Sequence, residues 1–558
     1  MAPLPFDTNA ENAKLARFRE EEEEDLARIL SEKYGLKYAD LRAAPIDAEA
    51  LRLIPEAKAR ETEVAPVHKG GTDVTLAIRN PQNPGLPVIL DDLKSRGLAV
   101  TQVLVSARSL EKAHARYAEL SFAKAERQGV LTVSPSELSL LTDSLVQPAE
   151  LRRYLEETIS GKQASEVTKL SEAIFAAAFA MKASDIHLEP EEEGAKLRFR
   201  LDGALSDVFF FAPETYRFLN SRLKILAGLK LNVHDRAQDG RFTAEIGTSD
   251  IEIRASAIPG NYGESFVMRL LDPSAIEIGL ESLGIHPKLL ARLTTEIKRP
   301  TGMLLTTGPT GSGKTTTLYA FLKKVQSPDV KIITIEDPVE YHLPGIVQTQ
   351  ANGKDYTFAG GLRSIVRQDP DVIMVGEIRD AETAGVAIQA ALTGHFVFST
   401  IHTNDAAGTF PRLSDLGVDS KEFGSAITVA MAQRLVRKLD PETSKQVELT
   451  GDNKTLVDRV LASIMDKTLI PENTTHVWVP DPTTADQTGY RGRVGLYEAI
   501  FMDDKMATFL RDNPSASDIR KEAARQGYIT MLQDGVLKAL AGLTSLEEVL
   551  SVADIPRD

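Results

Sequence analysis

Cysteine is absent from all 558 residues of the chain. The protein can therefore form neither disulfides nor thiolate metal sites, and its composition fits a reducing cytosol. Long apolar runs are missing as well, because the longest, at residues 173–181, is far shorter than the roughly 20 residues that a membrane-spanning helix needs. Residues 1–10 contain no basic segment followed by an apolar stretch, so we expect no secretory signal.

An excess of positive charge is also lacking, since the formal net charge is −15. A chain with this balance is a poor binder of polyanions, which disfavours DNA or RNA as the main partner. The composition, 42% hydrophobic and 26% charged, is typical of globular domains with cores. The length allows roughly three to five domains of ordinary size.

The order of apolar patterns and turn signals predicts an α/β protein with three domains. A small α/β domain is expected at residues 1–127, followed by a helical linker at 128–163. The second domain, at 164–284, is predicted to be α+β, and its expected elements are a helix at 167–182 and strands at 196–201, 242–245, 250–257 and 265–271. The third domain, at 285–558, alternates helices with strands at 303–307, 331–335, 372–375 and 396–400, which predicts a mostly parallel sheet covered on both faces.

A glycine-rich loop follows the apolar run 303–307 and leads into a helical pattern at 316–322. This context turns a G-x-x-x-x-G-K-[ST] match into a predicted phosphate-binding loop. Backbone N–H groups and the helix N-terminus would hold the phosphates of ATP, Lys314 would reach the β- and γ-phosphates, and the Thr315 hydroxyl would bind Mg²⁺. The predicted nucleotide-binding residues are Gly308, Pro309, Thr310, Gly311, Ser312, Gly313, Lys314, Thr315 and Thr316.

Carboxylates follow two of the predicted strands. Glu377 lies at the carboxyl end of the strand at 372–375, where such sheets bind ligands, and we expect it to orient Mg²⁺, partly through water. Glu336, Asp337 and Glu340 follow the strand at 331–335. We favour Glu340 as the residue that orients the attacking water, with Glu336 as the competing candidate and a merely charged loop as the alternative.

Two histidines, His395 and His402, flank the predicted strand at 396–400. Histidines in such places are often structural hydrogen-bond partners, but His402 lies at the strand end, as a sensor of the γ-phosphate would. The sequence leaves both interpretations open. The pair is a poor candidate for zinc, because no third ligand with suitable spacing is evident.

Taken together, these motifs resemble the ATPases of type II secretion and type IV pilus assembly. The resemblance is strong over residues 165–558 and is carried, in the family's order, by ASDIHLEP, RFRLDG, QDGRF, GESFVMRLLD, GPTGSGKTTTLY, TIEDPVE, RQDPDVIMVGEIRDAETA, ALTGHFVFSTIHTNDA, QRLVRKL, TGYRGRVGLYEA and TMLQDGVLKALAGLTSLEEVL. Residues 46–67 resemble the family's first N-terminal domain, which the pilus retraction ATPases lack. The Arg-Leu-Gly-x-x-Leu motif with which some members bind cyclic di-GMP is not found in this domain, so that ligand is not predicted.

The resemblance implies a homohexamer of RecA-like ATPase domains, each preceded by a PAS-like second domain. Arg254 and Arg269 match the family's arginines that approach the γ-phosphate, where a guanidinium would stabilise the transferring phosphoryl group. The alternative for each is an arginine on a strand face, paired with a nearby acid.

The implied protein is a cytoplasmic ATP-hydrolysing motor at the inner face of the cytoplasmic membrane. It would power type IV pilus assembly through an inner-membrane platform protein, reach the membrane only through partners and bind no nucleic acid directly. The alternatives are a type II secretion motor, a DNA-translocating hexamer and a non-hydrolysing scaffold. One departure stands out: many members bind zinc through two Cys-x-x-Cys pairs, whereas residues 440–487 must fold without them, using a predicted helix at 456–465. No zinc is predicted.

Overall fold

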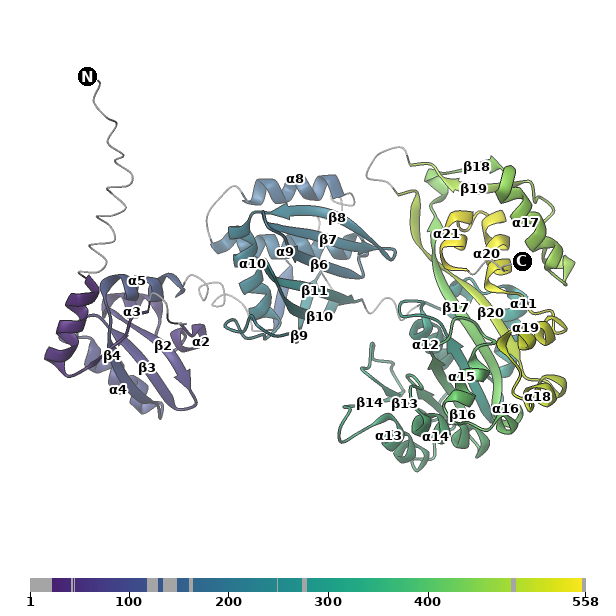
Figure 1. Ribbon diagram of the computed structural model, residues 1–558, viewed down its shortest axis with the longest axis horizontal. Helices are drawn as coiled ribbons and strands as arrows, with labels where there is room; N and C mark the ends of the chain where they lie inside the picture. The colour runs from purple at the N-terminus through teal and green to yellow at the C-terminus, as the bar shows by residue number, and fades with distance from the viewer. Residues whose placement is uncertain are drawn as a thin grey trace, which may run out of the picture. The chain divides into compact units, whose positions relative to one another are not determined.

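The computed structural model describes residues 23–41, 44, 46–117, 129–133, 148–159, 164–247, 249–272, 278–482 and 488–553. Two compact units divide the chain, with the main division between Leu270 and Leu271. The first unit holds two sheets and the second holds a larger α/β domain (Figure 1). No helix among the described residues is both long enough and apolar enough to cross a membrane.

A four-stranded sheet in the order β1-β4-β3-β2 forms the first domain. Strand β3 pairs antiparallel with β2 through a tight turn at Gly71, whose φ of 62° a glycine adopts without strain, and parallel with β4. The core lies between the sheet and its helices, and includes Leu76, Ile89 and Leu110. The elements are β1 (Lys37–Tyr38), α2 (Ala48–Leu51), α3 (Glu56–Glu61), β2 (Val64–Gly70), β3 (Asp73–Ile78), α4 (Leu86–Ser95), β4 (Ala99–Leu104) and α5 (Ala107–Ala115). Residues 23–34 are also helical.

The second domain is a seven-stranded sheet in the order β5-β9-β10-β11-β6-β7-β8, with three helices. Burial alternates along its long strands, as in β9 and β10, so one face packs on helices while the other is open. Its elements are β5 (Val130–Val133), α8 (Pro148–Ile159), α9 (Ala164–Ala180), β6 (Asp185–Pro190), β7 (Ala195–Leu201), β8 (Ala204–Phe211), α10 (Pro213–Leu226), β9 (Gln238–Ile246), β10 (Ser249–Gly260) and β11 (Gly263–Leu271).

The expectation of a linker at 128–163 is wrong for the residues described there. Strand β5 pairs parallel with β9 of the seven-stranded sheet. Leu151 and Leu155 of α8 are fully buried in the same core as Phe175 of α9. These segments complete the second domain, because the edge of β9 and the apolar face of α9 would otherwise be exposed.

The third domain is built on a seven-stranded sheet in the order β14-β13-β15-β16-β12-β17-β20. Every pairing in it is parallel except that between β17 and β20. The strands are β12 (Gly302–Thr307), β13 (Ile332–Glu336), β14 (Val347–Gln350), β15 (Val372–Val375), β16 (Phe396–Ile401), β17 (Ile427–Leu439) and β20 (Tyr490–Phe501). This is the mostly parallel α/β sheet that the sequence pattern indicates.

Helices cover both faces of this sheet (Figure 1). Leu304 of β12 packs in one core with α11 (Pro287–Glu296) and α12 (Lys314–Val325). Its neighbours Met303 and Leu305 point the other way, as successive strand residues must, and pack in a second core. The helices that pack in that second core include α13 (Phe358–Val366), α14 (Ala381–Leu392), α15 (Thr409–Asp415) and α16 (Ser420–Ala426).

The expected boundary at residue 284 lies too late in the chain. Leu280, in the short 3₁₀ helix Leu280–Leu283, is buried in the same core as α12 of the third domain. The segment before α11 therefore belongs to the third domain.

The cysteine-free insert folds around ordinary apolar contacts. Strands β18 (Ser444–Glu448) and β19 (His476–Pro480) pair antiparallel, and helix α17 (Gly451–Ser463) buries Val457 and Leu461 in the domain core. The chain ends in α18 (Asp504–Leu510), α19 (Ala516–Ala524), α20 (Met531–Leu540) and α21 (Leu546–Val552). Trp478 of β19 lies against Gly542, where an added Cβ would come within 2.8 Å of the indole ring. Apolar packing thus holds the described part of the insert in the domain.

Candidate functional site

The glycine-rich loop connects β12 to α12 at the carboxyl end of β12, an interior strand of the sheet. Gly308, Gly311 and Gly313 have φ values of 148°, 79° and 86°, a backbone that L side chains rarely adopt. Helix α12 begins at Lys314, so its first N–H groups point toward the loop. A loop of this geometry at a helix N-terminus is an anion-binding site.

Strand β17 supports this loop from one side. A Cβ at Gly308 would lie 2.5 Å from the Gln433 backbone oxygen, and one at Gly313 would lie 2.7 Å from Gln433 Nε2. Thr317 of α12 donates a hydrogen bond of 2.8 Å to Gln433 Oε1. Gln433 was not among the predicted site residues, although it begins the QRLVRKL motif; only the tertiary fold brings it to the loop.

Lys314 folds back over the loop. Its Nζ donates hydrogen bonds to the Gly308 and Pro309 carbonyl oxygens, at 2.8 and 2.9 Å. Burial lowers the pKa of Lys314 and Arg434 lowers it further, whereas Glu377 raises it. Among the described residues, the hydrogen bonds of Lys314 go to carbonyl oxygens, and a half-buried cation in such surroundings favours an incoming anion.

The loop also carries two hydroxyl side chains, those of Ser312 and Thr315. Ser312 is 3% exposed and its Oγ has no hydrogen-bond partner within the described residues. Thr315 follows Lys314 in the first turn of α12. A buried hydroxyl without a partner is costly, so Ser312 fits a phosphate oxygen as its partner. The Thr315 hydroxyl is an oxygen ligand of the kind that Mg²⁺ prefers.

Glu377 follows β15 and Gly376 at the same edge of the sheet as the loop. Its carboxylate is 14% exposed and forms an ion pair with Arg379. His402, just beyond β16, places Nε2 at 3.2 Å from Glu377 Oε2. The structure thus brings together two of the predicted site residues, and adds Arg379, which the sequence argument missed although it stands in the same GEIRD segment.

Hydrogen bonds fix the ends of the strands that carry these groups. Thr403 N donates to Thr307 Oγ1 at 2.7 Å, which ties the loop after β16 to the last residue of β12. Thr400 Oγ1 donates to the Gly376 carbonyl oxygen at 2.7 Å, beside Glu377. His395 lies at the opposite end of β16, where Nδ1 is 3.1 Å from the Ala390 carbonyl oxygen of α14. His395 therefore has a structural hydrogen-bond partner in α14, whereas the partner of His402 is Glu377, in the candidate site.

Glu336 and Glu340, the two candidates for orienting water, lie in different environments. Glu336 is 2% exposed, and its carboxylate accepts hydrogen bonds from Tyr319 Oη, Thr334 Oγ1 and Gln348 Nε2. Burial raises the pKa of Tyr319, and the Glu336 carboxylate raises it further. Glu340 is only partly buried and has contacts of its own. With its carboxylate engaged by three side chains, Glu336 has the environment of a structural group.

The predicted arginines lie in the other compact unit, on the open face of the seven-stranded sheet. Arg254 of β10 stands directly opposite Arg241 of β9 in the antiparallel register. Arg269 of β11 stands opposite Asp185 of β6, and its Nε lies 3.0 Å from Asp185 Oδ1. Arg241, in the QDGRF motif, was not among the predicted site residues.

Few of the described side chains around the loop could bind a metal ion, which is typical of a site that binds magnesium together with a nucleotide. No group of three or more His, Cys, Asp or Glu side chains able to hold a metal occurs in the part of the chain that the structure describes. Mg²⁺ commonly keeps several waters and takes one or two protein ligands together with substrate phosphates. Thr315 and Glu377 suit that role better than that of a protein-enclosed metal cage.

A glycine loop between the central parallel strand and a helix, with an acid at the end of a nearby strand, defines the class of P-loop nucleotide-binding domains. Residues 160–551 match the type II/IV secretion system protein family, and residues 34–123 match the MshEN domain. The chain belongs to the type II/IV secretion system protein family. The resemblance seen in the sequence is thereby confirmed.

Relatives are similar over most of the chain. It is 36% identical over 532 residues to the type IV pilus assembly ATPase PilB of Myxococcus xanthus, covering 95% of this chain and 91% of the relative. It is 38% identical over 476 residues to type II secretion system protein E of Klebsiella pneumoniae, covering 82% and 92%. The solved structure of the Yersinia pseudotuberculosis ATPase DotB shares the fold, with a TM-score of 0.50 and 19% identity over 71% of this chain and 94% of that one.

Proposed function

We propose that the protein is a motor ATPase that hydrolyses ATP to ADP and phosphate and powers type IV pilus assembly. It works as a homohexamer on the cytoplasmic side of the inner membrane and drives a platform protein there. The observation that carries the proposal is the unengaged Ser312 hydroxyl beside Lys314, in a loop whose strand-end neighbours are Glu377 and His402. Family membership and the pilus assembly relative support the coupling to a fibre.

Each site residue has a role in this proposal. The loop from Gly308 to Thr316 binds the phosphates, and Lys314 exchanges its carbonyl partners for phosphate oxygens. Mg²⁺ would supply positive charge that offsets the negative charge developing on the phosphate oxygens. Thr315 and Glu377 would hold it, the latter partly through water. Glu340 orients the attacking water, and His402 senses the γ-phosphate through its contact with Glu377.

The second domain completes the site in the assembled motor. Arg254 and Arg269 stabilise charge on the transferring phosphoryl group, and Arg241 joins Arg254 because the two are directly opposed. Like charges opposed across a strand pair are destabilising, and an anion between them relieves the repulsion. In this proposal the second domain is PAS-like and the third is RecA-like.

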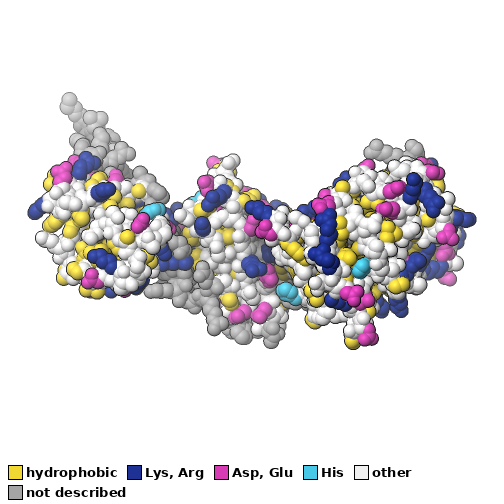
Figure 2. Space-filling model, turned by 90° about the horizontal axis from the view of Figure 1, so that it is seen from below, with side chains coloured by type: hydrophobic (Ala, Val, Ile, Leu, Met, Phe, Trp, Pro, Cys, Tyr) yellow, Lys and Arg dark blue, Asp and Glu magenta, His cyan; other side chains and the backbone are white. Residues whose placement is uncertain are grey.

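Type II secretion is the second candidate, because relatives of both names align along most of the chain. The neighbouring genes separate the two functions. Genes for pilins and a retraction ATPase favour pilus assembly, whereas an operon with an outer-membrane secretin favours type II secretion. A DNA translocase fits less well. The net charge is −15, and on the face in Figure 2 acidic side chains lie among the basic ones.

The test is phosphate release by the full chain and by Lys314→Ala. We expect the variant to lose turnover and to fail to restore surface pili in a strain that lacks the gene. Lys324→Ala is the matched control, since Lys324 lies on the same helix but pairs with Glu281 at 2.9 Å. Equal background release by the wild type and Lys314→Ala would overturn the proposal and favour a non-hydrolysing scaffold.

A further inference from the structure

Asp185 occupies a central place on the open face of the seven-stranded sheet. It begins β6, the strand between β11 and β7, and both neighbouring strands place an arginine directly opposite it: Arg269 on β11 and Arg200 on β7. Its side chain is only 6% exposed, although aspartate carboxylates normally lie in water. Such a carboxylate needs close partners, because a poorly hydrated charge without them is costly.

The contacts supply those partners in a specific way. Asp185 Oδ1 lies 3.0 Å from Arg269 Nε, and Oδ2 lies 3.3 Å from Arg200 Nε. Ser184 Oγ donates a hydrogen bond of 2.8 Å to Oδ2. The carboxylate thus uses one oxygen for each arginine and is oriented by the serine.

The contact with Arg269 leaves that arginine available. Asp185 engages the inner nitrogen, Nε, and the side chain of Arg269 remains 54% exposed. No second partner of Arg269 is found in the described part of the chain. Because a guanidinium is planar, fixing Nε also fixes the direction of its two outer nitrogens, which stay free for an anion.

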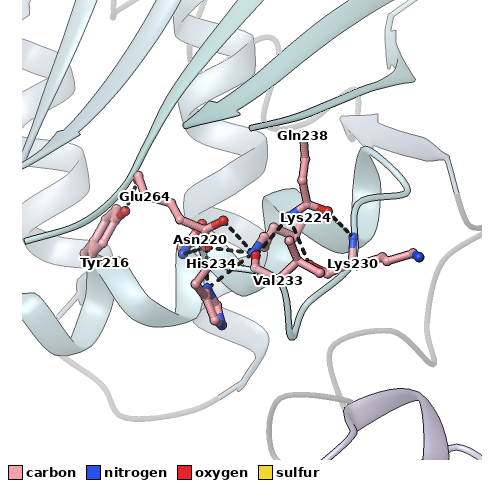
Figure 3. Close-up of polar contacts among 8 residues, drawn as sticks. All are labelled: Tyr216, Asn220, Lys224, Lys230, Val233, His234, Gln238 and Glu264. Atoms are coloured by element: carbon pink, nitrogen blue, oxygen red, sulfur yellow. Dashed lines mark hydrogen bonds and ion pairs between the residues drawn. The ribbon is translucent and has the colours of Figure 1, made fainter. Parts of the chain in front are cut away.

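The backbone of β11 is held independently, from the other side of the sheet. Glu264, near the start of β11, faces the helices and lies 2.6 Å from Lys224 Nζ of α10 (Figure 3). His234 Nδ1 lies 2.7 Å from the same carboxylate, and Tyr216 Oη donates to the Glu264 carbonyl oxygen. Because the backbone of β11 is anchored in this way, only the long side chain of Arg269 can still change its direction. Asp185 is the group that restricts that side chain.

We propose that Asp185 is the positioning residue of Arg269: it holds the guanidinium in a fixed direction so that its outer nitrogens meet the transferring phosphoryl group. This inference rests on the proposed function, in which Arg269 completes the ATP site. Asp185 itself touches neither nucleotide nor magnesium. Its effect is on turnover, because a pre-oriented arginine acts on charge that develops in the transition state.

The test is a double-mutant cycle in the full-length protein, measured as phosphate release at saturating MgATP. Asp185→Asn keeps the shape of the side chain and removes its charge, and we expect kcat to fall about tenfold or more, with KM for ATP little changed. In the Arg269→Ala background the same substitution should cause no further loss, because the group it positions is gone. Glu189→Gln is the matched control: Glu189 lies on the same strand and face and pairs with Arg198 at 3.4 Å, so kcat should stay at the wild-type value.

Other outcomes overturn the inference in distinguishable ways. Additive losses of kcat in Asp185→Asn and Arg269→Ala, with a lowered Tm in the former, would make Asp185 a structural residue only. A loss that disappears in the Arg200→Ala background instead would assign its action to Arg200. If Arg269→Ala lowers kcat while Asp185→Asn does not, the inference fails and the proposed function stands. If Arg269→Ala leaves kcat unchanged, the proposed role of Arg269 fails as well.

Discussion

His402 Nε2 lies 3.2 Å from Glu377 Oε2, because the two residues follow the ends of the neighbouring parallel strands β16 and β15. Arg379 pairs with the other oxygen of the same carboxylate. Both oxygens of Glu377 are therefore engaged by cationic or titratable groups. In the proposed site, Mg²⁺ and its waters would compete with His402 and Arg379 for the Glu377 carboxylate.

Glu377→Gln should lower the rate of ATP hydrolysis about 10²- to 10⁴-fold while ATP binding persists, because the amide keeps the shape but not the charge. Phosphate release and nucleotide affinity, measured on the same preparation, separate the two effects. Asp371→Asn is the control: Asp371 lies at the other end of the same strand, and its Oδ2 accepts a hydrogen bond of 2.7 Å from Lys331 N. A Glu377→Gln protein with wild-type turnover would remove Glu377 from the site.

Glu336→Gln and Glu340→Gln should have opposite effects. Glu336 accepts three hydrogen bonds in the core, so an amide in its place puts a donor against a donor and costs about 1–3 kcal/mol of stability. Glu340→Gln should leave the Tm unchanged and lower kcat. Thermal melts and phosphate release, measured on both variants, distinguish the structural residue from the one that orients the attacking water. A normal Tm with lost turnover in Glu336→Gln would assign the water-orienting role to Glu336 instead of Glu340.

Gly308→Ala should abolish nucleotide binding. The residue has a φ of 148°, and an added Cβ would lie 2.5 Å from the Gln433 carbonyl oxygen, so the loop has to move. Gly385→Ala, in helix α14, meets nothing within 4 Å and should stabilise the protein by about 0.5–1 kcal/mol with binding intact. Titration with a fluorescent ATP analogue tests both, and tight binding by Gly308→Ala would contradict the loop geometry.

Glu498 should make stability depend on pH. It is 3% exposed and accepts hydrogen bonds from Ala406 N and Met531 N, at 2.8 and 2.9 Å. Burial raises its pKa above the usual 4.5, while the two N–H groups lower it. At a pH between the usual pKa and the raised pKa, Glu498 keeps its proton in the folded state and has lost it in the unfolded chain. The stability that Glu498 contributes is therefore fully present below the usual pKa and is lost as the pH rises through the raised pKa.

Comparison with Glu498→Gln isolates this effect. The Tm of the wild type minus that of the variant should shrink as the pH rises above the usual glutamate pKa of 4.5, because glutamine does not titrate. Thermal melts at steps of pH measure the difference. A gap that widens with pH would show that the carboxylate is stabilised rather than penalised in the fold.

A chelator should leave the Tm of the protein unchanged. The insert at 440–487 is held by α17, by β18 with β19 and by Trp478 against Gly542. Gly542→Ala should lower the Tm, since the added Cβ would meet the indole ring and the φ is 76°. A marked drop in Tm on chelation, with magnesium restored in the control, would contradict the prediction.

Local sequence patterns predicted four strands of the third domain, because these strands are buried on both faces and read as apolar runs. β12, β15 and β16 are examples, at 302–307, 372–375 and 396–401. Residues 128–163 were predicted poorly for the opposite reason. Strand β5 and helix α8 take their structure from pairing with β9 and packing on α9, which are distant in the sequence.

The sequence by itself determined that this chain binds a phosphate: a loop with glycines at the required positions between a strand and a helix is a local signal. It also supplied the order of the acidic and histidine motifs. Only the tertiary structure decided which groups act together. Gln433 reaches the loop, His402 reaches Glu377 and Arg269 reaches Asp185 because strands separated in the sequence are neighbours in a sheet. Contacts of that kind depend on register and burial, which no short motif encodes.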